Sequence, residues 1–70
     1  MEREFVHSSN VVSVGYSESE MILEVEFHGG SVYQYYGVPE FVYEEMMTAP
    51  SKGKFLAAQI KNQYAFSRVE

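Results

Sequence analysis

The stretch MILEVEFHGGSVYQYYGVP, residues 21–39, decides the fold of this 70-residue chain. In its first part, apolar residues occupy every second position, which is the pattern of a β-strand buried on one face. The pair Gly29-Gly30 then supplies the backbone freedom that a tight hairpin turn requires. Residues 32–36 form a β-branched and aromatic run that ends at Gly37 and Pro39, so the stretch predicts a β-hairpin. The alternating apolar positions of its first strand are Met21, Leu23, Val25 and Phe27, with Ile22, Glu24 and Glu26 between them.

Two registers of this hairpin are open, and they differ in where Tyr33 and Tyr35 point. With a loop of the two glycines alone, both rings lie beside glutamates on the outer face. A three-residue loop also includes His28. In that register Tyr33 lies opposite Val25, and Tyr35 lies opposite Leu23 on the same apolar face. Because hydrophobic patterning normally decides register, we favour the three-residue loop, which makes both rings mainly core.

A further strand is expected before the hairpin. Residues 11–16 are rich in valine, and strict alternation puts Val12, Val14 and Tyr16 on one face. Residues 1–6 are mixed and charged, so we expect a frayed start. Because successive short connections favour an antiparallel meander, the three strands should lie side by side in chain order.

Two helices are expected after the hairpin, as a cover for the apolar face of the sheet. Pro39 takes the first helical position of the first helix. Pro50 stops that helix, because the residue before a proline is pushed out of helical geometry. Ser51 serves as the N-cap of a second, amphipathic helix that runs to about Asn62. The alternating tail, residues 65–69, predicts a short C-terminal edge strand.

Length and composition indicate a single domain, residues 1–70, of class α+β: a three-stranded antiparallel β-meander followed by two α-helices packed on one face. Five phenylalanines and six tyrosines supply much of its core. The absence of cysteine excludes disulfides and thiolate metal sites, and it fits a reducing compartment. There is no secretory segment and no apolar run of membrane-spanning length, so we expect a cytoplasmic protein without a membrane partner.

Charge is divided unevenly along the chain. The formal net charge of −5 argues against simple electrostatic binding to nucleic acid. All ten acidic residues except Glu70 lie before residue 46, where the only cation is Arg3. Residues 46–69 carry no acid and four cations, namely Lys52, Lys54, Lys61 and Arg68. Such an asymmetry can mark a binding face, although a solvated helix face is its commoner origin.

Two short motifs are candidate binding sites. The run Ser51-Lys52-Gly53-Lys54 places lysines at a helix start, where unpaired N–H groups and the helix dipole attract anions. Capping and solubility explain the same residues more simply. The pair Tyr33-x-Tyr35 has the spacing of aromatic residues that stack nucleic-acid bases on an open sheet. Core packing is the simpler interpretation of that pair as well.

No constellation of catalytic or metal-binding residues stands out. The His7-Ser8-Ser9 run lacks an acid that would orient the histidine, so it is interpreted as a turn. His28 has no other ligand type at metal-binding spacing. The acidic pairs are most simply solvated positions. We therefore expect a protein that is not an enzyme and that needs no metal or cofactor.

Together, the motifs resemble the KTSC domain family over about residues 6–64. The family is named for its occurrence at the C-terminus of some lysyl-tRNA synthetases, and it also occurs as free-standing bacterial proteins. The resemblance implies a small module for which RNA binding is suggested by the synthetase context. The motifs that carry it are Ser8-Ser9-Asn10, Val14-Gly15-Tyr16, Leu23-x-Val25-x-Phe27, Tyr33-x-Tyr35, Val38-Pro39 and Ala49-x-Ser51-x-Gly53-x-Phe55, followed by Ile60 and Tyr64.

Two functions remain as hypotheses. The first is a non-catalytic RNA-binding module, whose basic second helix contacts phosphates and whose tyrosines stack bases. The alternative is a small protein-interaction or regulatory module that uses the acidic sheet face or an edge strand. For the RNA hypothesis, the expected binding residues are Ser51, Lys52, Gly53, Lys54, Lys61, Arg68, Tyr33 and Tyr35.

Overall fold

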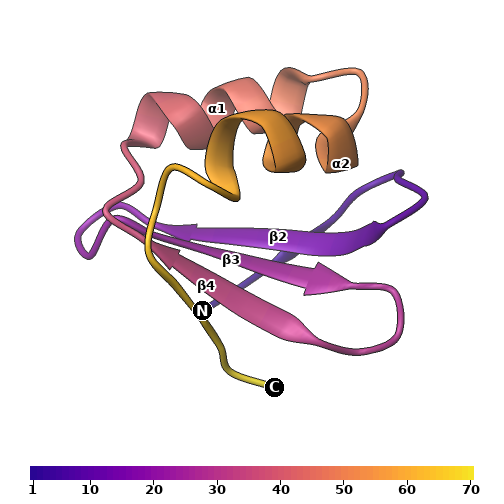
Figure 1. Ribbon diagram of the computed structural model, residues 1–70, viewed down its shortest axis with the longest axis horizontal. Helices are drawn as coiled ribbons and strands as arrows, with labels where there is room; N and C mark the ends of the chain where they lie inside the picture. The colour runs from indigo at the N-terminus through magenta and orange to yellow at the C-terminus, as the bar shows by residue number, and fades with distance from the viewer.

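The computed structural model, which describes residues 1–70, has one antiparallel sheet with helices on a single face (Figure 1). Strands β1 (Glu4–Phe5), β2 (Val11–Ser17), β3 (Ile22–Phe27), β4 (Val32–Tyr36) and β5 (Phe66–Arg68) lie side by side in chain order. The helices are α1 (Glu40–Thr48), α2 (Lys52–Phe55) and the π-helical turn η1 (Leu56–Ile60).

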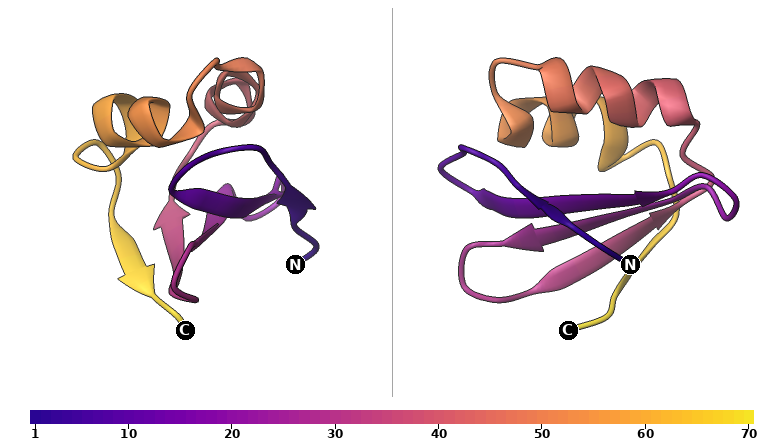
Figure 2. Two further views of the ribbon diagram at one scale, coloured as in Figure 1. Left: turned by 90° about the vertical axis from the view of Figure 1, so that its right-hand side faces the viewer. Right: turned by 180° about the vertical axis from the view of Figure 1, so that it is seen from behind.

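The predicted α+β class is confirmed, but the sheet has five strands where the sequence predicted a three-stranded meander. The N-terminal segment, expected to be frayed, pairs with β2 as β1. The expected edge strand near the C-terminus is β5, which pairs with β4. Figure 2 shows the helices above the sheet and the two added strands at its opposite edges. Strand β1 is too short to be recognised from periodicity, whereas the alternation of the tail did indicate β5.

The hairpin of β3 and β4 adopts the register of the three-residue loop. The Phe27 N–H donates to the Ser31 carbonyl at 2.9 Å and closes the loop. Gly29 and Gly30 have φ angles of 104° and 98°, which residues with a side chain rarely adopt. Met21, expected as the first inward residue of the strand, instead lies in the turn before β3 with a φ of 56°. The facing pairs include Leu23–Tyr35 and Val25–Tyr33.

Strand β2 follows the predicted alternation at Val14 but departs from it at Val12. Val11 faces Phe27, whereas Ser13 faces Glu26, so the strand carries one extra residue at this point. This β-bulge makes Val11, and not Val12, a fully buried residue of the core. A strict two-residue period does not reveal a bulge, and the predicted face of Val12 was therefore wrong.

Helix α1 begins and ends close to its predicted bounds. Pro39 has extended backbone angles and occupies the N-cap, one residue before the predicted helical position. Ala49, which precedes Pro50, has a ψ of 142°, so the helix ends where the proline forces extended geometry. Phe41 is 63% exposed, because only one face of this helix lies on the sheet.

The second helix is shorter than predicted and changes its geometry half-way. The Ser51 hydroxyl accepts a hydrogen bond from the Lys54 N–H at 3.2 Å, which confirms the predicted N-cap. The Lys61 N–H donates to the Leu56 carbonyl at 2.8 Å, a bond that spans five residues and widens the turn. Regular structure ends at Ile60, two residues before the predicted end.

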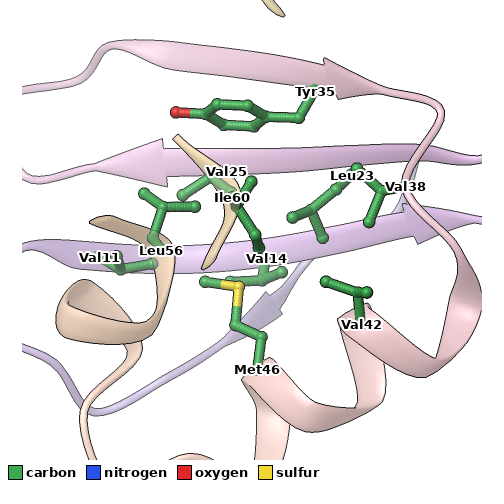
Figure 3. Close-up of a cluster of buried hydrophobic side chains, with 10 residues drawn as sticks. All are labelled: Val11, Val14, Leu23, Val25, Tyr35, Val38, Val42, Met46, Leu56 and Ile60. Atoms are coloured by element: carbon green, nitrogen blue, oxygen red, sulfur yellow. The ribbon is translucent and has the colours of Figure 1, made fainter. Parts of the chain in front are cut away.

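Ten buried side chains from the sheet, the helices and the connection between β4 and α1 form the core (Figure 3). Complete burial of one large aliphatic side chain stabilises a protein by about 1.5–3 kcal/mol. The cluster therefore holds the helical layer on the sheet. Its members are Val11, Val14, Leu23, Val25, Tyr35, Val38, Val42, Met46, Leu56 and Ile60.

The opposite, outer face of the sheet carries a polar network that ties down the N-terminal segment. The Arg3 guanidinium pairs with the Glu24 carboxylate and donates through Nε to the Ser13 hydroxyl at 3.0 Å. Ser13 donates in turn to Glu26 at 2.8 Å. The Gln34 amide donates to Glu24 at 2.8 Å. Glu24 is only 7% exposed, so it is not the solvated residue that the sequence predicted.

These contacts make Glu24 sensitive to acid. Burial by itself would raise the pKa of Glu24, but hydrogen bonds from Gln34 and Arg3, together with the Arg3 charge, lower it. The unfolded chain, in which a glutamate has a pKa of about 4.3, then binds this proton more readily than the folded chain. The stabilisation is therefore present above about pH 4.3 and is lost as the pH falls through the lower, folded pKa.

We expect Glu24→Gln to lower the free energy of unfolding at neutral pH, because it removes a buried partner of Arg3. The difference from the wild type should shrink as the pH falls below about 4, since the wild-type carboxylate is then protonated too. Urea denaturation at a series of pH values measures both effects. Glu44→Gln, on the exposed side of α1, should keep the wild-type acid dependence. A constant difference between Glu24→Gln and the wild type would contradict the assignment.

A second prediction concerns Gly15, where the N-terminal segment approaches β2. A Cβ atom at Gly15 would lie 2.5 Å from the Glu2 carbonyl oxygen and 2.9 Å from Arg3 Cγ. We therefore expect Gly15→Ala to displace this segment and to lower the free energy of unfolding by about 1–3 kcal/mol. Urea denaturation gives the value.

Gly53→Ala is the matched control for Gly15→Ala. Its added Cβ would have no neighbour closer than 3.4 Å, and the residue is helical. We expect it to keep or raise the free energy of unfolding, by up to about 1 kcal/mol. Equal stabilities for Gly15→Ala and the wild type would show that the N-terminal segment is not held at this point.

Candidate functional site

An open groove of about 430 Å³ lies between the inner face of the sheet and the second helix. Four aromatic residues of the sheet line it, namely Phe27, Tyr33, Tyr35 and Phe66. The facing wall comes from α2, η1 and the residue that follows them, through Gly53, Leu56, Ala57 and Lys61. The three- to four-residue spacing of these positions places them on one side of the helix.

The four rings form a connected cluster with Tyr33 at its centre. The Tyr33 ring centroid lies 5.7 Å from that of Phe27, 6.5 Å from that of Tyr35 and 5.8 Å from that of Phe66. These are normal separations for interacting aromatic rings. Tyr35 is 3% exposed, Tyr33 is half-buried and Phe66 is 54% exposed. Tyr35 is therefore core, as predicted, whereas Tyr33 and Phe66 offer part of their surface to the groove.

Glycine at position 53 leaves the groove open rather than permitting a close contact. The nearest atom to a Cβ built there is Asn10 Nδ2 at 3.4 Å, and the next is Asn10 Cβ at 3.7 Å. An alanine would thus fit without a clash but would narrow the groove. Ala57, the next small residue along this wall, is exposed, and its short side chain also leaves the groove open.

Two polar groups in the groove have no partner within the protein. The Tyr35 hydroxyl makes no protein hydrogen bond, and no fully buried polar atom lacks a partner, so this hydroxyl is reached through the groove. Figure 3 shows it pointing away from Val38. The Asn10 carbonyl accepts from the His28 N–H at 2.9 Å, but the Asn10 side-chain amide is unpaired. Both groups are free to bind a ligand.

The protonation state of the Tyr35 hydroxyl suits hydrogen bonding to a ligand. Burial raises the pKa of Tyr35, and the neighbouring Tyr33 raises it further. The hydroxyl is therefore protonated at neutral pH and can donate. Lys61 adds an exposed ammonium group to the groove lining.

The structure brings together some of the residues that the sequence predicted for nucleic-acid binding and not others. Tyr33, Tyr35, Gly53 and Lys61 line the groove. Arg68 faces Tyr33 across β4 and β5, and its Nε donates to the Glu70 carbonyl at 2.9 Å. The remaining three, Ser51, Lys52 and Lys54, lie outside the lining.

The three outlying residues have identifiable places in the fold. Ser51 serves as the helix cap. The Lys52 ammonium donates to the Ala49 carbonyl at 2.9 Å and thereby helps to close the loop between the helices. Lys54 is exposed. The predicted anion site at the helix start therefore contributes only Gly53 to the groove.

Sequence reasoning missed Asn10, Phe27, Ser31 and Phe66 as parts of one site. Asn10 was interpreted as a turn residue, and Phe66 as part of an alternating tail. They meet because β5 returns to the edge of β4 and because the backbone N–H of His28 donates to the backbone carbonyl of Asn10, immediately before β2. No local pattern reports either contact.

Other kinds of site are not formed. No three histidine, aspartate or glutamate side chains gather in an arrangement that could hold a metal ion. None of the helices has the length and hydrophobicity to cross a membrane. The acidic sheet face, proposed above as a protein-binding surface, exposes less acid than predicted because Glu24 is buried and paired with Arg3.

The fold and the groove define a small α+β module in which a single helical layer covers one antiparallel sheet. The chain belongs to the KTSC domain family, whose model matches residues 7–64. This result confirms the family that the sequence motifs indicated.

Relatives occur both alone and within a larger enzyme. The crystal structure of a KTSC domain protein from Yersinia pestis superimposes with a TM-score of 0.93 at 37% identity, and it covers 99% of this chain and 97% of that one. A protein of Stutzerimonas stutzeri is 37% identical over the full length of both chains. A lysine–tRNA ligase of Nostoc punctiforme is 36% identical over 87% of this chain, which spans only 11% of the ligase.

The free hydroxyl of Tyr35 gives a direct test of the groove. Tyr35→Phe removes a group without a protein partner, so we expect the free energy of unfolding to change by less than about 0.5 kcal/mol. Tyr16→Phe is the same chemical change at a hydroxyl that donates to the Val38 carbonyl at 2.6 Å. It should cost about 1–2 kcal/mol. Thermal or urea denaturation compares the two, and an equal cost would mean that the Tyr35 hydroxyl has a structural partner.

Proposed function

We propose that this protein is a cytoplasmic, non-catalytic module that binds short single-stranded RNA in the aromatic groove. The observation that carries the proposal is the combination of partly exposed rings, Tyr33 and Phe66, with the ammonium group of Lys61 in one groove. Proteins that bind single strands without a deep active site combine aromatic stacking platforms with basic side chains.

The distribution of charge supports a local contact rather than an extended one. The net charge of −5 repels a long polyanion. However, the segment that forms one wall and one edge of the groove, residues 46–69, carries four cations and no acid. Glu24 and Glu26 point to the other side of the sheet, where Arg3 pairs with them. A short single-stranded RNA bound in the groove contacts the basic segment and lies away from most of the acidic surface.

The relatives support RNA as the class of ligand. Lysine–tRNA ligases act on a tRNA, as their name states, and some carry a segment similar to 77–87% of this chain. The same domain also makes up whole small proteins, as in Stutzerimonas stutzeri. A module shared in this way fits a binding role that is independent of the ligase reaction.

We expect a short fluorescent single-stranded RNA to bind at low ionic strength, with an affinity that falls as salt is added, measured by fluorescence anisotropy. Ala57→Leu should weaken binding, because its side chain enters the groove. Lys61→Gln should weaken it too and should reduce the slope of log affinity against log salt by about 0.7, the value for one phosphate contact on a single strand.

Matched controls separate the groove from general electrostatics. Ala58→Leu makes the same change at the next exposed position, outside the groove lining, and should bind like the wild type. Lys54→Gln removes the same charge as Lys61→Gln and should have the smaller effect. No association of the wild type with RNA at low ionic strength would refute the proposal. Equal losses for the two lysine variants would mean that the RNA responds to general charge and not to the groove, and would refute the proposed site.

A further inference from the structure

We infer that the groove holds one unpaired nucleotide, with its base against Tyr33 and Phe66, the base edge at Asn10 and the Tyr35 hydroxyl, and its phosphate at Lys61. This assignment rests on the proposed RNA binding and names the part of the RNA that the protein reads. The protein would thus recognise one nucleotide rather than a continuous stretch of RNA.

The size of the groove supports one nucleotide. Its volume of about 430 Å³ lies near the lower end of the range for small-molecule sites, about 300–1,000 Å³. The two partly exposed rings also limit the number of bases. The planes of Tyr33 and Phe66 are inclined by 41°, so a flat base can lie fully against only one of them while the other flanks it.

The free polar groups favour a base over an apolar side chain. Tyr35 is only 3% exposed, yet its hydroxyl makes no hydrogen bond within the protein and keeps some exposure beside the groove. A ligand that covers this hydroxyl without bonding to it would leave a buried polar group unpaired, which is costly, so the groove favours a ligand that hydrogen-bonds there. The Asn10 amide offers both a donor and an acceptor, and the edges of nucleobases present such pairs. An apolar peptide side chain would cover the Tyr35 hydroxyl and leave it unpaired.

The separation of these groups matches the two ends of a nucleotide. Asn10 lies beside Gly53, at the start of the helical wall, and Lys61 lies at its end. Eight residues of helix span about 12 Å, which is sufficient to place a base at one end and its phosphate at the other. Because the base is attached to a phosphate only a few bonds away, one ligand satisfies the aromatic floor, the polar groups and the lysine together.

The test is an NMR titration of the full-length protein with AMP, GMP, CMP and UMP, and with ribose 5-phosphate as the ligand that lacks a base. We expect the nucleoside monophosphates to shift the signals of Gly53 and Ala57 and to compete with RNA. Ribose 5-phosphate should bind much more weakly, because base stacking is absent.

Two variants test the reading of the base edge. Asn10→Ala and Tyr35→Phe should each weaken binding of at least one monophosphate by roughly two- to tenfold, because each removes one hydrogen bond. Neither side chain bonds to the protein, so both variants should fold. Asn62→Ala, an exposed asparagine outside the groove lining, is the control and should bind like the wild type.

The outcomes distinguish this inference from the proposed function. If RNA binds but monophosphates do not compete with it, or if ribose 5-phosphate binds as well as AMP, the single-nucleotide assignment is wrong and RNA binding stands. If monophosphates bind in the groove but RNA does not associate, the RNA function is wrong and the nucleotide site stands. Unchanged affinity in both Asn10→Ala and Tyr35→Phe would overturn the assignment of the base edge.

Discussion

The register of the hairpin between β3 and β4 is the constraint on which the rest of the structure depends. A shift of one residue would turn every side chain of β4 to the opposite face. In the observed register, Tyr33 and Tyr35 face the helices, whereas Gln34 faces Glu24 on the other side. The three-residue glycine loop imposes this pairing, because it accepts two consecutive positive φ angles. The core, the outer polar network and the groove all follow from it.

Each face of the sheet then has a different task. On the outer face, Arg3 forms an ion pair with Glu24 and a hydrogen bond with Ser13. This network holds the first strand in place. On the inner face, α1 is packed closely through Met46, whereas the second helix presents Gly53 and Ala57 toward the rings of β4 and β5. The short side chains on this wall keep a groove open beside the core, and the unpaired hydroxyl of Tyr35 lies where the two regions meet. The binding properties thus arise from this local arrangement and not from the fold class itself.

Several elements of the fold could be predicted from the sequence because their causes are local. Alternation shows the strands, Pro50 stops the first helix, and Ser51 caps the second. The candidate site could be predicted only in part. Tyr33, Tyr35 and Lys61 stood out by type and spacing, but Asn10 and Phe66 have no local signature. The lysines at the helix start stood out too, although Lys52 bonds to the loop that precedes it. The bulge at Val11 and the N-terminal edge strand were missed, since each depends on a partner strand that is remote in sequence.

The sequence by itself determined the hairpin, its register, the helical cover and the family, because backbone propensity, side-chain period and turn chemistry act over a few neighbouring residues. Only the tertiary structure decided which side chains meet in the groove. Asn10, Tyr35, Gly53, Lys61 and Phe66 come from four separate segments, and their proximity depends on how the C-terminal strand returns to β4 and how the second helix lies across the sheet. These long-range contacts depend on the simultaneous burial of the whole apolar surface, so no short stretch of the chain predicts them.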